Sequence, residues 1–114
     1  DVLQRAIEDF YEMGVKTIEM TGGDPTMHPH FDEALQQCVE RFDLVAVITN
    51  GIELSDRAIK LLSRENTICQ IDLDGSTPEM HDELRGVVGA HAGAINAARK
   101  LNKQGARFRV AMSV

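Results

Sequence analysis

The chain alternates short runs of β-branched residues with longer stretches of helical periodicity, and this alternation limits the folds open to it. Four runs have the composition of strands: Lys16–Thr21, Leu44–Thr49, Thr67–Leu73 and Arg107–Val114. The second, "LVAVIT", is almost continuously apolar, as expected of a strand that is covered on both faces. Because strands that alternate with helices are joined by right-handed crossovers, the pattern predicts an α/β fold with a parallel sheet.

Helical patterns fill the intervals between these runs. One stripe of apolar residues spans Val2 to Met13 and is followed by Gly14, where a glycine cap belongs. A second stripe consists of Phe31, Leu35, Cys38, Val39 and Phe42. Both patterns predict amphipathic helices that cover the sheet.

The second half of the chain carries three further helical signals. Ser55 is a good N-cap for a third helix. Residues 76–86, "STPEMHDELRG", place a cap and a proline where a short helix or turn begins. The last helix is expected from about Ala92 to Lys103, with Ile95, Ala98 and Leu101 packed inward, and it should stop before a glycine.

Composition excludes several classes of protein. The 114 residues predict one domain, 1–114, and no apolar run is long enough to span a bilayer. The net charge of −6 argues against a nucleic-acid partner. The basic residues near the last helix and strand are expected to form a solvated face: Arg99, Lys100, Lys103, Arg107 and Arg109. The two cysteines, Cys38 and Cys69, fit buried thiols in a reducing cytoplasm.

Polar residues and glycines gather where three successive strands end. The first strand ends in "TGGDP" (21–25), the second in "TNG" (49–51) and the third in "DLDG" (72–75). Because the carboxyl ends of parallel strands meet at one edge of a sheet, these groups predict a ligand site there. An open doubly wound sheet and part of a (β/α) barrel both fit the pattern, and both bind ligands at this edge.

Four sequence blocks together resemble one known family. They are "TGGDPT" (21–26), "ITNG" (48–51), "IDLDG" (71–75) and "HDELRG" (81–86), in that order. The chain resembles the radical S-adenosylmethionine enzymes, specifically the SPASM-like branch that modifies peptides, haem precursors and similar cofactors. The resemblance implies a partial (β/α)6, TIM-type barrel, of which this chain would be the region from the second to the fifth strand.

The resemblance also implies roles for individual residues. It implies that Gly22, Gly23, Asp24 and Pro25 hold the amino group of S-adenosylmethionine. The chemistry is sensible because an ammonium needs acceptors, and glycines let backbone carbonyls turn toward it.

Three more residues complete the expected site. Asp72 stands where relatives often carry a serine that meets the ribose, and an aspartate accepts both ribose hydroxyls. Arg85 matches an arginine that pairs with the cofactor carboxylate, for which its planar fork is suited. Asn50 lies at the same edge and is expected to contact cofactor or substrate.

The family's [4Fe–4S] cluster binds to a CxxxCxxC loop, which these 114 residues lack. Cys38 and Cys69 lie on a helix stripe and inside a strand, so neither is expected to be a cluster ligand. The interpretation is that the chain is a fragment of a longer enzyme whose cluster loop lies upstream. The intact enzyme would cleave S-adenosylmethionine to a 5′-deoxyadenosyl radical and modify a peptide or tetrapyrrole-like substrate, whereas the fragment would be inactive.

Two other functions stay open at this point. One is a non-catalytic α/β binding or scaffold module that has lost the cluster. The other is an unrelated α/β enzyme that uses the strand-end carboxylates to bind metal or phosphate. In either case an arc that lacks its first strand would expose a sheet edge, and the isolated fragment is expected to self-associate.

Overall fold

The computed structural model describes residues 2–51, 54–74 and 90–113, and side chains in these ranges except at 74, 90 and 113. Its elements are, in chain order, α1 (Val2–Glu12), β1 (Thr17–Met20), η1 (Pro25–Met27), α2 (Phe31–Arg41), β2 (Leu44–Thr49), α3 (Asp56–Leu61), β3 (Thr67–Asp74), α5 (Ala90–Lys103) and β4 (Phe108–Ser113). All four predicted strands are therefore confirmed, with ends that shift by at most one residue. The 3-10 turn η1 was not predicted, and the short helix or turn expected at 76–86 lies outside the described residues.

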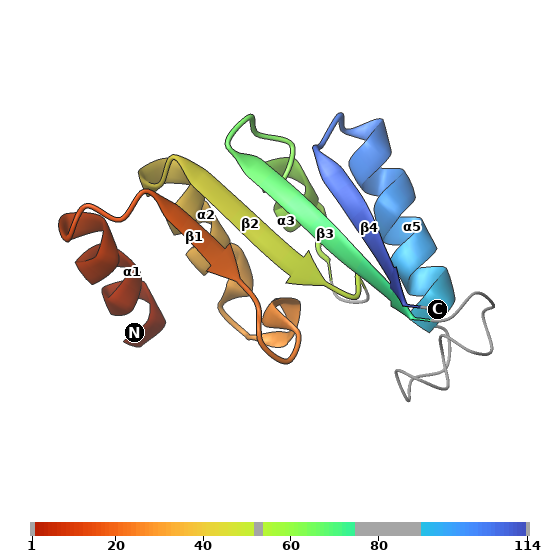
Figure 1. Cartoon of the computed structure of the whole chain (residues 1–114), viewed down its shortest axis with the longest axis horizontal. Helices are drawn as coiled ribbons and strands as arrows, with labels where there is room; N and C mark the ends of the chain where they lie inside the picture. Colours follow the sequence, from red (N-terminus) through yellow and green to blue (C-terminus); the bar gives the residue numbers. More distant parts are fainter. Residues whose placement is uncertain (1, 52–53, 75–89, 114) are drawn as a thin grey trace.

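The four strands form one parallel sheet in the order β1-β2-β3-β4. The first paired residues are Thr17 with Leu44, Val45 with Thr67, and Cys69 with Phe108. Each strand is therefore paired in parallel with the next strand along the chain. All strand arrows point toward the same edge (Figure 1). The predicted gathering of strand ends at one edge is thus confirmed.

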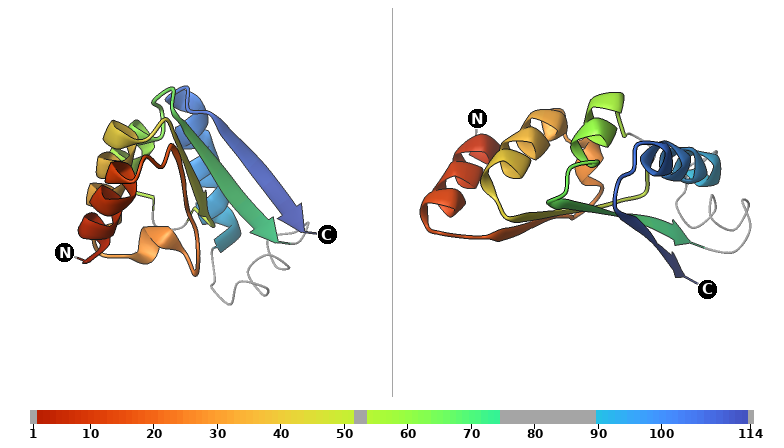
Figure 2. Two further views of the ribbon diagram at one scale, coloured as in Figure 1. Left: turned by 60° about the vertical axis from the view of Figure 1, so that its left-hand side comes forward. Right: turned by 90° about the horizontal axis from the view of Figure 1, so that it is seen from above.

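The described helices cover one face of the sheet. Seen from above, α1, α2, α3 and α5 lie on the same side and the strands curve beneath them (Figure 2). A doubly wound sheet would carry helices on both faces, so this arrangement is an arc of a (β/α) barrel. The expectation that β2 is covered on both faces is wrong, because Val45 and Val47 are buried whereas Leu44, which points to the other face, is 37% exposed.

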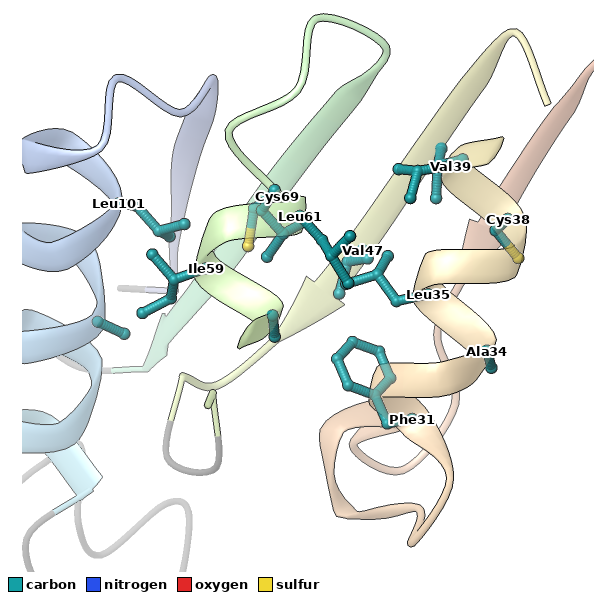
Figure 3. Close-up of a cluster of buried hydrophobic side chains, with 14 of the residues drawn as sticks. Phe31, Ala34, Leu35, Cys38, Val39, Val47, Ile59, Leu61, Cys69 and Leu101 are labelled. Atoms are coloured by element: carbon teal, nitrogen blue, oxygen red, sulfur yellow. The ribbon is translucent and has the colours of Figure 1, made fainter. Parts of the chain in front are cut away.

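The core lies between the sheet and α2, α3 and α5 (Figure 3). All five residues of the predicted α2 stripe are buried. The α1 stripe is buried only in part, because Ile7 is enclosed while Val2, Phe10 and Met13 are exposed. Helix α1 therefore packs on the rest of the molecule along a narrow strip.

Helix α5 packs differently from the prediction. Its buried residues are Ala94, Ala97 and Leu101, while Ile95 and Ala98 are half-buried. Small side chains are needed here because α5 approaches Gly51 closely. A Cβ placed on Gly51 would lie 3.1 Å from the Cβ of Ala97 and 3.3 Å from the Cα of Ala94.

The predicted caps are present. Gly14 and Gly105 have positive φ, and after each helix the next backbone N–H donates back to a carbonyl five residues earlier, Val15 to Phe10 and Ala106 to Leu101. This bond is the mark of a Schellman C-cap. Ser55 accepts a hydrogen bond from the N–H of Ala58 and caps α3. Within the three described ranges, no helix is long and apolar enough to cross a membrane.

Candidate functional site

The carboxylate of Asp24 joins the loop after β1 to the end of β2. Its Oδ1 accepts from the backbone N–H of Thr26 at 3.0 Å and from the Thr26 hydroxyl at 2.7 Å. The Thr49 hydroxyl lies 2.8 Å from Oδ1 and 3.0 Å from Oδ2, and Oδ2 accepts from the N–H of Asn50 at 2.8 Å. One side chain thus fixes two strand ends relative to each other.

The local sequence explains this geometry. Asp24 is the N-cap of η1, and Pro25 follows at the first position of that turn, where a missing N–H costs nothing. Thr49 is buried at the end of β2, and its hydroxyl also accepts from the N–H of Gly51 at 3.1 Å. The "DPT" and "TNG" segments are therefore parts of one hydrogen-bonded unit.

Gly22 and Gly23 form the open part of the same loop. Gly22 has a φ of +110°, a conformation that L-residues with a side chain rarely adopt. No described heavy atom lies within 4 Å of a Cβ built on either glycine. The loop thus has open space on the side where a side chain would lie, which leaves room for a ligand to approach its backbone.

The Asp24 side chain has a different role from that of the loop backbone. Its two carboxylate oxygens already accept from four protein donors: the N–H and the hydroxyl of Thr26, the hydroxyl of Thr49 and the N–H of Asn50. An ammonium bound by this carboxylate would have to share these oxygens with the existing donors. The geometry gives Asp24 a structural role, because its carboxylate holds the loop after β1 against the end of β2.

Asp72 lies on the helix-free face of the sheet. Its neighbours Ile71 and Leu73 are buried under the helices, and alternate residues of a strand point to opposite faces. Gln70 donates from Nε2 to Oδ1 of Asp72 at 2.9 Å, and Arg109 of β4 donates from Nε to Oε1 of Gln70 at 2.8 Å. The expected contact residue is therefore held in a polar chain that spans β3 and β4.

The structure brings several of the predicted site residues together. Asp24, Pro25 and Asn50 share the hydrogen-bonded unit at the ends of β1 and β2. Asp72 lies on the neighbouring strand β3, on the helix-free face of the sheet, and Arg85 lies outside the described residues.

The sequence placed Thr49 at the predicted ligand edge but did not identify it as a partner of Asp24, and it gave no sign of Gln70. Arg109 is exposed, as expected of a solvated face, but it also donates to Gln70. Thr49 directly precedes "NG" at a strand end, a pattern that could have drawn attention to its hydroxyl. The link from Arg109 to Gln70 could not be found in this way, because it joins residues 39 positions apart. Only the register of β3 with β4 brings these side chains together.

Both cysteines are free and buried, as predicted. Burial raises the pKa of Cys38 from 9.0 to about 11, although the nearby Arg41 acts in the opposite direction. Burial also raises the pKa of Cys69 to about 12, and the negative charge of Asp24 adds to this effect. Such thiols stay protonated at neutral pH, which makes them poor metal ligands.

The described residues do not form an iron–sulfur site. Among them, no group of three or more His, Cys, Asp or Glu side chains could hold a metal ion. The cluster that the resemblance implies therefore finds no ligands in the part of the chain that the structure describes.

The fold is that of an α/β protein of the barrel type, whose parallel strands all end at one edge of the sheet. A sequence profile of the Radical SAM superfamily matches residues 1–113. The chain belongs to this superfamily, and the resemblance noted in its four sequence blocks is confirmed.

Curated relatives support the assignment. The chain is 34% identical over 113 residues to the antilisterial bacteriocin subtilosin biosynthesis protein AlbA of Bacillus subtilis, covering 97% of the chain and 25% of AlbA. It is 29% identical over 109 residues to an AdoMet-dependent heme synthase of Oleidesulfovibrio alaskensis, covering 95% of the chain and 28% of that protein. The chain thus spans about a quarter of the length of these relatives.

Solved structures show the same fold. Streptococcus suis SuiB bound to S-adenosylmethionine superposes with a TM-score of 0.78 at 22% identity, over 94% of the chain and 25% of SuiB. The enzyme anSMEcpe with bound AdoMet and the Kp18Cys peptide superposes with a TM-score of 0.73 at 19% identity, over 96% of the chain and 33% of that protein. The predicted partial-barrel fold is confirmed by these similarities.

Proposed function

We propose that this chain forms part of the S-adenosylmethionine cradle of a radical SAM enzyme that modifies a peptide, a haem precursor or a similar cofactor. Gly22 and Gly23 offer backbone carbonyls to the methionine amino group, and Asp24 with Pro25 keeps the loop in place. Asn50 lines the same edge, Asp72 accepts from the ribose, and Arg85 pairs with the cofactor carboxylate. When bound, S-adenosylmethionine supplies the radical chemistry.

The observation that carries the proposal is the Asp24 unit at the carboxyl edge. A ligand amine is bound well by acceptors that are already fixed before it arrives, because no entropy is then lost in ordering them. The Thr49 hydroxyl and the Asn50 N–H fix the position of Asp24, and Asp24 in turn fixes the loop that carries Gly22 and Gly23.

We further propose that residues 1–114 are a single-domain fragment of a longer protein, here called the full-length protein, which carries a CxxxCxxC loop upstream. Neither buried thiol replaces those ligands. The 114-residue chain alone is therefore expected to give no turnover. Free, buried thiols also suit a reducing compartment, and we propose the cytoplasm as its location.

The substrate proposal comes from the relatives. One is named for the biosynthesis of a bacteriocin and another for the synthesis of heme, and a SuiB structure contains the precursor peptide SuiA. These names agree with the substrate class that the four sequence blocks imply, which is a peptide or a tetrapyrrole-like molecule.

The experiment is anaerobic reconstitution of the full-length protein with iron and sulfide, followed by incubation with S-adenosylmethionine and a reductant. We expect 5′-deoxyadenosine to form in the unmodified protein and in the control Asp9→Asn, which changes an exposed carboxylate. Asp24→Asn should form much less.

Two results would contradict the proposal. A reconstituted protein that binds a cluster but leaves S-adenosylmethionine intact would favour the scaffold function. A protein that binds neither iron nor S-adenosylmethionine would favour an unrelated α/β enzyme.

A further inference from the structure

Three polar side chains form a hydrogen-bonded chain on the helix-free face of the sheet. Arg109 donates through Nε to Oε1 of Gln70 at 2.8 Å, and Gln70 donates through Nε2 to Oδ1 of Asp72 at 2.9 Å. Gln70 is the direct register partner of Arg109, and Asp72 lies two residues further toward the carboxyl end of β3. The chain therefore leads along the sheet toward the edge where the ligand is proposed to bind.

The chain fixes the orientation of the Gln70 amide. A glutamine amide has one accepting and one donating end, and it can in principle point either end at a neighbour. Arg109 only donates, so it selects the oxygen of Gln70. The NH2 group of Gln70 is then turned toward Asp72.

The amide in turn constrains the Asp72 carboxylate. A donor that is fixed at Oδ1 restricts rotation of the carboxylate, and hydrogen bonds in series strengthen one another. A carboxylate held in this way is prepared to accept from the two hydroxyl groups of a ribose without losing further conformational freedom.

We propose that Gln70 and Arg109 are positioning residues that set Asp72 for selective recognition of a ribose. This inference rests on the proposed function, since it concerns the residue expected to meet the ribose of S-adenosylmethionine. Arg109 acts through Gln70 and Asp72 and does not itself touch the ligand. The pair thus makes the site prefer a ribonucleoside over its 2′-deoxy counterpart.

The test is a double-mutant cycle in the full-length protein. Dissociation constants are measured by calorimetry for S-adenosylmethionine and for its 2′-deoxyribose analogue, in the unmodified protein and in Arg109→Met, Asp72→Ala and the double variant. Gln70→Met tests the middle of the chain, and Arg107→Met is the matched control because Arg107 is also exposed and adjoins β4. The ratio of the two constants is taken within each protein, so a loss of folded protein does not alter it.

We expect Arg109→Met and Gln70→Met each to reduce the preference for the ribose about 3- to 10-fold, the size of one hydrogen bond. In the Asp72→Ala background, Arg109→Met should have no further effect, and Arg107→Met should leave the ratio unchanged.

Different outcomes separate the two proposals. An unmodified protein that binds neither compound contradicts the proposed function. The positioning role alone is overturned if the unmodified protein binds S-adenosylmethionine but Arg109→Met does not change the ratio of the two dissociation constants. It is also overturned if Arg109→Met changes this ratio equally with Asp72 and with Ala at position 72.

Discussion

At the scale of single residues, Asp24 shows how a residue can matter to a binding site through geometry. Its carboxylate accepts from Thr26, Thr49 and the N–H of Asn50, and so it links the loop after β1 to the end of β2, although Asp24 and Thr49 are 25 residues apart in the sequence. The resemblance to the family located the residue, but the side chains that hold it became visible only in the structure.

Asp24→Asn should destabilise the protein and weaken S-adenosylmethionine binding together. Replacing the carboxylate removes the charge that strengthens these bonds and turns an acceptor oxygen into a donor that faces other donors. We expect a loss of about 1–3 kcal/mol in the free energy of unfolding, measured by denaturant titration. An unchanged stability would show that the Asp24 unit does not hold the loop, and Asp9→Asn serves as the control.

Gly22→Ala should separate stability from binding. Gly22 and Gly105 both have positive φ and open space where a Cβ would lie, so alanine at either position should cost about 1 kcal/mol in stability from backbone strain. Only Gly22→Ala should also weaken S-adenosylmethionine binding, because Gly105 lies at the far end of β4. Equal affinities in the two variants, measured by calorimetry, would argue against the loop as the amine site.

The buried thiols give a dependence of stability on pH. Their pKa values rise from 9.0 to about 11 and about 12 on folding, so folding favours the protonated thiols. This contribution is fully present below pH 9 and is lost as pH rises toward these values. The free energy of unfolding of the unmodified protein should therefore fall more steeply above pH 9 than that of Cys38→Ala/Cys69→Ala. Parallel profiles for the two proteins would contradict the assigned shifts.

At the scale of secondary-structure elements, the sequence predicted most of the fold because the signals were local. The apolar periodicity of α2 and the caps at Gly14, Ser55 and Gly105 depend on neighbouring residues, and each was confirmed. The packing of α5 was predicted less well, since Ala94 and Ala97 face the sheet only because Gly51 lies opposite them. Such a contact depends on the tertiary arrangement.

Gly51→Ala should therefore cost more stability than Gly22→Ala. The added methyl group would meet Ala97 at 3.1 Å in addition to the strain of a φ of +83°. We expect about 2–4 kcal/mol, the sum of strain and overpacking, from thermal unfolding. If Gly51→Ala and Gly22→Ala lower the stability equally, α5 must shift away from residue 51 without a measurable loss of stability.

At the scale of the whole molecule, the arc leaves apolar surface uncovered at both ends. Of the described residues, Val2, Phe10 and Met13 are exposed near α1, and Val110 and Met112 are 48% and 54% exposed on β4. Strands β1 and β4 are the outer strands of the sheet, each with one neighbour. Which chain segment covers these edges in a longer protein could not be read from these 114 residues.

The isolated chain should self-associate because of these edges. Light scattering at tens of micromolar, where exposed strand edges promote association, should give a mass above 12.6 kDa that increases with concentration. Val110→Lys/Met112→Lys should lower the apparent mass. A monomeric mass at all concentrations would show that the exposed strand edges do not cause self-association.

We propose that the Gly22–Gly23 loop holds the amino end of S-adenosylmethionine at the carboxyl edge of the sheet. The most direct measurement is an anaerobic crystal structure of the full-length protein with this cofactor. In that structure the methionine amino group should lie within about 3.2 Å of carbonyl oxygens in the loop, and the ribose should lie next to Asp72. A cofactor bound on the helix-covered side or at the opposite ends of the strands would contradict it.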